Sequence, residues 1–141
     1  MTSEVYLSQS ARTRSVIGAF FEVYRSLGYG FLEHVYSVAL ELELLGREHR
    51  VAREVSVPIS YKGREITRQR LDMIVDDMIV VELKATEALP PASLRQVFSY
   101  LRATDFRIGL LFHFGPKPAV RRVERHGAQF RRVSAFDEEP L

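Results

Sequence analysis

The sequence contains no cysteine. This absence excludes disulfide bonds, thiol catalysis, and zinc or iron–sulfur sites that are held by cysteine. The sequence also lacks any stretch approaching the roughly 18 apolar residues of a membrane-spanning helix. Its first residues are polar and include no apolar run of signal-peptide length. We therefore expect a cytoplasmic protein in a reducing compartment, without membrane contact.

Neither sign of charge dominates the chain, because the formal net charge is only +2. Basic residues nevertheless gather toward the C-terminus, where residues 91–136 contain nine Lys or Arg and two acidic residues. Such a segment could bind a polyanion, although a solvated surface explains it equally well. The candidates for phosphate contacts are Arg121, Arg122, Arg125, Arg131 and Arg132.

A chain of 141 residues is typical of one domain. We expect residues 1–141 to form a single domain with a core over about residues 12–134 and a frayed tail, DEEPL. Apolar periodicity predicts helices over 10–27 and 31–45, separated by Gly28-Tyr29-Gly30. It predicts a strand meander over 55–61, 65–75 and 78–84, with Pro58 marking an edge strand or a bulge. It further predicts a helix to about residue 104, a buried strand over 107–114, a short helix over 117–126 and a strand over 128–133. Together these elements make an α/β fold with a mixed sheet flanked by helices.

Three polar residues stand out in the predicted meander. Asp72 lies on its second strand. Glu82 and Lys84 lie two apart on its third strand, so Glu82 and Lys84 point to the same face. A carboxylate and a lysine at the end of an apolar strand are costly to bury unpaired. Asp72 and Glu82 are oxygen ligands of the kind that Mg²⁺ prefers. An exposed strand with a surface ion pair would give the same pattern.

A shared metal sets a condition on the turn between these strands. Directly opposed residues of an antiparallel pair point to the same face. A two-residue loop at Asp76-Asp77 would place Asp72 opposite Val81, and Glu82 would face away. A three-residue loop would place Asp72 opposite Glu82. We therefore predict an odd loop or a bulge.

Two helices carry further polar residues at helical spacing. Glu33 and Tyr36 share a face of the second helix, and Gln96 and Tyr100 share a face of the later helix. Each has an ordinary explanation, because the helix dipole favours Glu33 in a first turn and tyrosine is common in cores.

Taken together, these residues resemble the GxxExxY proteins, which are assigned to the PD-(D/E)XK nuclease superfamily near its RecB-type branch. The resemblance lies in four motifs in the same order along the chain: G-x-x-E-x-x-Y, a single D, E-x-K and Q-x-x-x-Y. The matching stretches are GFLEHVY (30–36), Asp72 within RLDMIV, ELK (82–84) and QVFSY (96–100). YKG at 61–63 and GLLFHFG at 109–115 also look like family features. The resemblance covers about residues 12–125. Two departures are Leu71 before Asp72 in place of proline, and His113 in place of asparagine.

The resemblance implies a restriction-endonuclease-like core with a divalent metal, Mg²⁺ or Mn²⁺. Asp72, Glu82 and the Leu83 carbonyl would hold the metal, Glu33 would complete the acidic cluster, and Lys84 would assist catalysis. Gln96 and Tyr100 would brace the site or contact the nucleic acid.

Three functions remain open from the sequence. The first is a Mg²⁺-dependent nuclease that hydrolyses phosphodiester bonds in DNA, in repair or in defence against foreign DNA. The second is a catalytically silent nucleic-acid-binding module or an accessory subunit of a nuclease complex. The third is metal-dependent hydrolysis of a small phosphate compound. Because so small a chain has little surface for clamping a duplex, we also expect a homo-oligomer or a protein partner.

Overall fold

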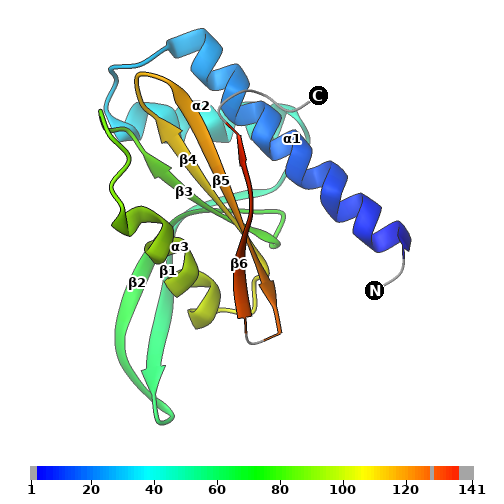
Figure 1. The fold of residues 1–141 in the computed structure, drawn as a ribbon, viewed down its shortest axis with the longest axis vertical. Coiled ribbons are helices and arrows are strands. Elements are labelled where there is room, and N and C mark those ends of the chain that lie inside the picture. Colours follow the sequence, from blue (N-terminus) through cyan, green and yellow to red (C-terminus); the bar gives the residue numbers. More distant parts are fainter. Residues whose placement is uncertain (1–2, 128, 137–141) are drawn as a thin grey trace.

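The computed structural model describes residues 3–127 and 129–136, with side chains described for residues 11–127 and 129. In chain order the elements are α1 (Ser3–Leu27), α2 (Glu33–Gly46), β1 (Val51–Tyr61), β2 (Arg64–Val75), β3 (Ile79–Lys84), α3 (Ala92–Ala103), β4 (Ile108–Phe114), β5 (Pro118–His126) and β6 (Gln129–Phe136). The strands form one sheet in the order β1-β2-β3-β4-β5-β6 (Figure 1). Only β3 and β4 are parallel, with α3 as their crossover. The predicted mixed sheet flanked by helices is confirmed.

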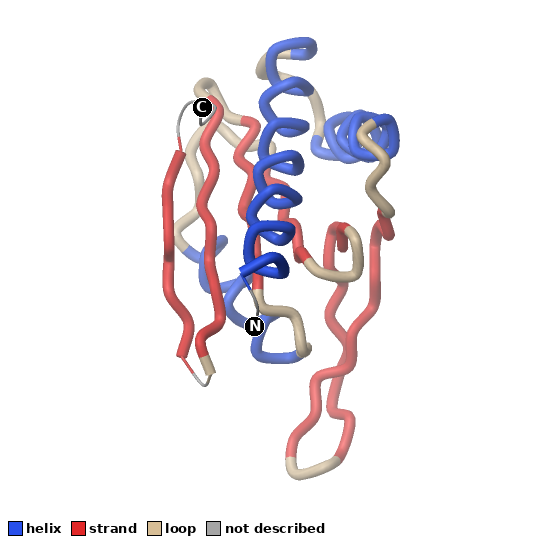
Figure 2. The backbone as a smooth tube through the Cα atoms, turned by 90° about the vertical axis from the view of Figure 1, so that its right-hand side faces the viewer, coloured by secondary structure: helices blue, strands red, loops and turns tan. Residues whose placement is uncertain are grey.

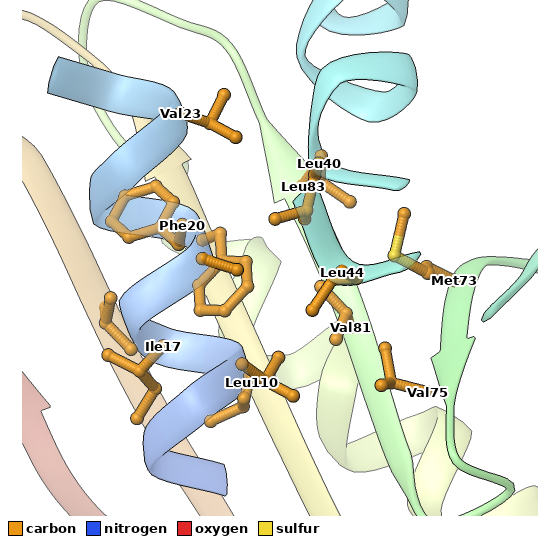
Figure 3. Close-up of a cluster of buried hydrophobic side chains, with 14 of the residues drawn as sticks. Ile17, Phe20, Val23, Leu40, Leu44, Met73, Val75, Val81, Leu83 and Leu110 are labelled. Atoms are coloured by element: carbon orange, nitrogen blue, oxygen red, sulfur yellow. The ribbon is translucent and has the colours of Figure 1, made fainter. Parts of the chain in front are cut away.

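The two faces of the sheet carry separate apolar clusters. On one face, α1 and α2 pack against alternate residues of β3 such as Val81 and Leu83 (Figure 3). On the other face, α3 packs against Val80 and Leu111. The alternation along β3 therefore points Ile79, Val81 and Leu83 away from the face that carries Glu82, as the sequence predicted.

A glycine allows α3 to approach the sheet closely. A Cβ atom added to Gly109 on β4 would lie 2.4 Å from Val97 Cγ1 on α3. This separation is far below van der Waals contact, so a larger residue would push the helix away from the sheet. The position of α3 matters because the helix carries Tyr100 toward the polar residues of β2 and β3.

The predicted helix over 117–126 is wrong, because these residues form strand β5. Val120 and Val123 lie three apart, which resembles helical spacing in the sequence. In the structure Val120 joins the cluster beneath α1, whereas Val123 joins the cluster beneath α3. A strand covered on both faces buries residues on both sides, so its sequence shows no simple alternation.

The other predicted elements are present with shifted ends. Helix α1 begins at Ser3, seven residues before the predicted start, and β1 begins at Val51 instead of Val55. Strand β1 is an edge strand with a register irregularity beside Ile59, as Pro58 predicted. The predicted frayed tail, residues 137–141, lies outside the described residues. In the part of the chain that is described, no helix has the length and apolar character needed to cross a membrane.

The turn between β2 and β3 has the predicted odd length. Val75 pairs with Ile79, which leaves Asp76, Asp77 and Met78 in the loop. Asp76 and Asp77 adopt φ angles of 56° and 50°, a left-handed conformation that aspartate tolerates better than most residues. The Met78 N–H donates to the Val75 carbonyl and closes the turn.

A buried polar network anchors this turn to α1. The His49 Nδ1–H donates to Asp76 Oδ2 at 2.7 Å, and His49 Nε2 lies 2.8 Å from Ser15 Oγ on α1. The Arg50 N–H donates to Asp76 Oδ1. Burial alone would raise the pKa of Asp76, but these hydrogen bonds and the nearby charges of His49 and Arg12 outweigh it and lower the pKa.

We predict that Asp76→Asn lowers the free energy of unfolding by roughly 1–3 kcal/mol, because the amide keeps one acceptor oxygen and places an NH2 donor against the donor that the other oxygen served. A lowered pKa stabilises the fold above the unfolded pKa, and that contribution is lost as the pH falls through the folded pKa. Urea denaturation between pH 7 and pH 3 should therefore show a weaker acid dependence in the variant than in the wild type.

Asp77→Asn is the matched control, because Asp77 occupies the same turn with its side chain 81% exposed. Its effect should stay within about 0.5 kcal/mol. Equal losses for the two variants would show that the network does not hold the turn.

Candidate active site

Asp72 and Glu82 meet where β2 and β3 separate. The pairing of the two strands ends at Met73 and Val81, and continuing this register places Asp72 opposite Glu82. Beyond that pair, the Leu83 N–H donates to Asp72 Oδ2 at 2.8 Å. The Asp72 side chain thus occupies the place of a strand partner, which satisfies a backbone group that would otherwise be unpaired. The geometric condition for a shared metal is met.

The separation of the strands has a visible cause in the paired strand β1. Arg53 bonds Glu41 of α2, whereas Val55, two residues later, packs in the cluster beneath α3. Residues two apart on a regular strand share a face. Arg53 and Val55 point to opposite faces of the sheet, so the strand rotates about its axis between these two residues. Glu54, at the turning point and opposite Asp72, has a φ of 56°. A strained non-glycine residue of this kind is uncommon and frequently marks a functional site.

Glu82 is almost fully buried, with 3% of its surface exposed. Its Oε1 atom lies 3.3 Å from Lys84 Nζ on the same face of β3. Burial and the negative charge of Asp72 raise the pKa of Glu82 to about 8, although Lys84 acts in the opposite direction. Without a metal ion, these surroundings favour a proton on the Asp72–Glu82 pair at neutral pH.

The charge of the pair fits a divalent metal. Glu82 Oε2 is buried and accepts no hydrogen bond from the described residues, and its contact with the Asp72 carboxylate requires a shared proton or a cation. A buried polar atom without a partner is costly, and a bound cation would remove that cost. Within the described residues, however, no group of three or more His, Asp or Glu side chains is arranged to hold a metal. The protein would thus supply two carboxylates, and water or backbone oxygens would supply the remaining ligands.

Glu33 begins α2, and much of its surface is exposed to solvent. Partial burial and the negative charge of Asp72 raise the pKa of Glu33, and Lys84 lowers it. Glu33 therefore senses the charges of Asp72 and Lys84, and its place in the acidic cluster stays a prediction.

The glycine and tyrosine of G-x-x-E-x-x-Y place Glu33 by fixing the connection from α1 to α2. Gly30 has a φ of 121°, which side chains other than hydrogen rarely permit. The buried Tyr36 hydroxyl donates to the Gly28 carbonyl and accepts from the Phe31 N–H. Its ring stacks on Phe114 of β4 at 4.1 Å between centroids. The motif is thus a fixed loop that sets where the first turn of α2 begins.

Tyr100 approaches the two acids from α3, on the other side. It is buried, and burial together with the charges of Glu82 and Asp72 raises its pKa to about 12. The phenol therefore stays protonated and can donate a hydrogen bond. Gln96, one turn earlier on the same face of α3, is exposed.

His113 is a structural residue in this arrangement. It pairs with Lys84 in the register of β3 and β4. Its Nε2 atom lies 2.8 Å from the Thr86 carbonyl oxygen and 3.1 Å from Thr86 Oγ1. The buried histidine thus ties down the segment that follows Lys84, where the sequence resemblance led us to expect asparagine.

Comparison with known proteins agrees with this geometry. A family model described as PD-(D/E)XK nuclease superfamily matches residues 10–125. The chain belongs to the PD-(D/E)XK nuclease superfamily. Neither the search of curated proteins nor the search of solved structures gave a match.

Members of the PD-(D/E)XK superfamily are generally nucleases that use divalent metals such as Mg²⁺ or Mn²⁺. Membership therefore implies binding of nucleic acid and suggests nuclease activity. The matched region spans all the residues that meet at the site, from Glu33 to Tyr100.

Of the arginines predicted to bind nucleic acid, the three with described side chains do not lie on one face of the sheet. Alternation along β5 places Arg121 and Arg125 on the face of α3, where the Arg125 guanidinium donates to the Thr104 carbonyl. Arg122 is on the face of α1 and is ion-paired with Glu124. The side chains of Arg131 and Arg132 lie outside the described residues. Leu111 of β4 pairs with Glu82 on one side and with Arg121 on the other. Arg121 therefore lies two strand spacings, or about 10 Å, from Glu82, and is nearer to it than Arg122 or Arg125.

The Ser15–His49–Asp76 chain resembles a nucleophilic triad in its order of contacts. Ser15 lies inside α1, however, where the backbone N–H groups are used by the helix and cannot form an oxyanion hole. The Arg47 guanidinium also donates to the Ser15 carbonyl. This network was not predicted from the sequence, and its geometry indicates that it anchors the β2–β3 turn.

We predict that the metal-free protein loses stability as the pH rises from about 4.5 to about 8. Over this window the folded state, in which the Glu82 pKa is about 8, binds more protons than the unfolded state, whose reference value is 4.5. The contribution is present below pH 4.5 and is lost above pH 8. Glu82→Gln should remove this slope and make the protein more stable than the wild type at pH 8 by roughly 1–3 kcal/mol.

Urea denaturation in EDTA measures this slope. Glu87→Gln provides the control, because Glu87 is exposed in the segment that follows β3. An unchanged slope in Glu82→Gln would mean that the Glu82 carboxylate is not destabilised by its surroundings.

Proposed function

We propose that the chain is a Mg²⁺- or Mn²⁺-dependent nuclease that hydrolyses phosphodiester bonds in DNA, in repair or in defence against foreign DNA. The observation that carries this proposal is the buried Glu82, which lies beside Asp72 and Lys84 and has an oxygen that accepts no hydrogen bond from the described residues. Such a pair of carboxylates is expensive to keep in the absence of a cation. We further propose that the chain is a GxxExxY protein of the RecB-type branch, on the motifs that carry the resemblance.

Asp72, Glu82 and the Leu83 carbonyl would hold the metal. When bound, the metal would make a coordinated water acidic and neutralise charge on the phosphate. Asp72 also fixes the Leu83 backbone through its hydrogen bond, so it positions the end of β3. Glu33 would add negative charge beside the pair.

The other residues would act on the substrate. Lys84, which lies 3.3 Å from Glu82, would stabilise negative charge that develops on the phosphate. Tyr100, held in its protonated form, would donate a hydrogen bond near the two acids. Gln96 is exposed one turn away and would contact the nucleic acid or brace the site. The predicted phosphate contacts by the basic residues of β5 and β6 remain part of the proposal.

A catalytically silent nucleic-acid-binding module or accessory subunit is the second candidate. It is favoured by one observation, because the described residues provide no group of three metal-ligating side chains. Two carboxylates and water bind a divalent metal weakly unless the substrate or a partner adds ligands.

A homo-oligomer or a protein partner also remains part of the proposal. The outward side of α2 exposes Leu42 and Leu45 by 65% and 51%. Exposed apolar residues that gather on one helix offer surface for such a contact.

We predict that Glu82→Ala abolishes both metal binding and cleavage of DNA. Lys84→Ala should keep much of the metal affinity and slow cleavage about a hundredfold or more, because the positive charge acts mainly in the transition state. A cleavage time course with labelled DNA and RNA beside a calorimetric metal titration measures both effects. Glu87→Ala and Lys117→Ala make the same changes at exposed positions and should behave like the wild type.

Two outcomes would reject the nuclease. If the wild type binds DNA without metal-dependent cleavage of any substrate, the binding module replaces it. If cleavage survives both Glu82→Ala and Lys84→Ala, these residues do not form the site.

A further inference from the structure

The ribbon formed by β1 and β2 extends well beyond the rest of the protein. In two perpendicular views, its far end projects past the helices and the remaining strands (Figure 1, Figure 2). The near part, with Val55, Val57 and Leu71, still packs against α3. From Pro58 to Arg68 every residue is exposed except the half-buried Ile59. Little apolar burial stabilises this far part, so packing does not explain its length.

The projecting part carries mainly positive charge. Residues 55–71 include four basic residues, Lys62, Arg64, Arg68 and Arg70, and one acidic residue, Glu65. All four basic residues are exposed. Arg68 is held by Ser56 and Glu65 across and along the ribbon, which keeps its guanidinium in place. A net charge of +3 on so small a surface exceeds the +2 of the whole chain.

The ribbon is joined directly to the candidate active site. Asp72 lies at its root, only two residues beyond Arg70, where the strands turn over at Glu54. At about 3.3 Å per residue, the eight residues from Asp72 to Arg64 reach about 26 Å from the acidic pair. A polyanion that entered the site in this direction would pass Arg64, Arg68 and Arg70 along that distance.

An aromatic residue lies at the tip. Tyr61 is 61% exposed, and Lys62 Nζ lies 5.3 Å from the centre of its ring. Exposed aromatic rings beside cations are suited to contact with sugars and bases, and a two-stranded ribbon is narrow enough for the major groove of a duplex. The tip and the basic residues along the ribbon are thus both suited to contact with nucleic acid.

We infer that the β1–β2 ribbon is an arm that binds the nucleic-acid substrate on one side of the cleaved bond, with Arg64 and Arg70 contacting its phosphates. The inference rests on the proposed function in that the same substrate occupies the site at the root of the arm. The arm acts in binding and does not take part in the chemical step. It therefore lowers the dissociation constant and KM and leaves kcat unchanged.

The test compares two double variants with the same change of charge. R64Q/R70Q alters the arm, and R14Q/R50Q alters exposed residues on α1 and before β1. Binding is followed by fluorescence anisotropy across a salt series, in the full chain carrying Glu82→Gln so that the nucleic acid stays intact. The probes are a duplex and a single strand of about 30 nucleotides, long enough to pass the tip of the arm.

R64Q/R70Q should weaken binding up to about tenfold and reduce the salt slope on the duplex by about 2, because each lost phosphate contact contributes about 0.9. R14Q/R50Q should leave both quantities unchanged. Loss on the duplex alone assigns the arm to a groove, and loss on the single strand as well assigns it to the backbone of one strand. In the catalytically intact chain, R64Q/R70Q should raise KM and keep kcat.

Equal binding by the two double variants on both probes would overturn the inference that the ribbon binds nucleic acid. This outcome is separate from failure of the nuclease, because binding is measured without cleavage. If the chain cuts nothing but R64Q/R70Q still weakens binding selectively, the arm stands and only the proposed cleavage fails. A fall in kcat with unchanged KM would also overturn the arm as a binding element.

Discussion

The hydrogen bond from the Leu83 N–H to the Asp72 carboxylate is the contact on which the arrangement of the site depends. Strand β2 must leave β3 beyond Met73 so that the long ribbon can project, and this departure removes a backbone partner from β3. The carboxylate of Asp72 replaces that partner at 2.8 Å. One side chain thereby ends the pairing of two strands and brings a negative charge next to Glu82. The strained backbone of Glu54 marks the same point on the neighbouring strand.

Packing from three directions then encloses the two acids. Gly109 lets α3 pack closely on the sheet, and the buried Tyr100 of this helix lies within electrostatic range of Glu82 and Asp72. The loop held by Tyr36 begins α2 at Glu33. The network of Ser15, His49 and Asp76 holds the turn from which β3 starts. The resulting burial raises the pKa of Glu82 to about 8, and a proton or a cation must therefore neutralise the pair.

Much of this arrangement could be predicted from the sequence, because it follows local rules. The helix pair, the meander and the three-residue loop follow from periodicity and from the requirement that Asp72 and Glu82 share a face. Strand β5 could not be predicted in the same way, since burial on both faces hides its alternation. The turnover of the ribbon at Glu54 and the contact of His49 with Asp76 depend on pairings between distant residues, for which a single sequence has no signal. The charge of the arm was also overlooked, because its four basic residues lie outside the basic C-terminal region.

We propose that Asp72 and Glu82 together hold one divalent metal at the end of β3. The most direct test is a crystal structure of the wild-type chain with Mn²⁺, in which anomalous scattering locates the ion. We predict a peak coordinated by carboxylate oxygens of both residues, with the Leu83 carbonyl among the remaining ligands. A well-ordered site without a peak at saturating Mn²⁺, or a peak bound elsewhere while Glu82 stays protonated beside Lys84, would contradict it.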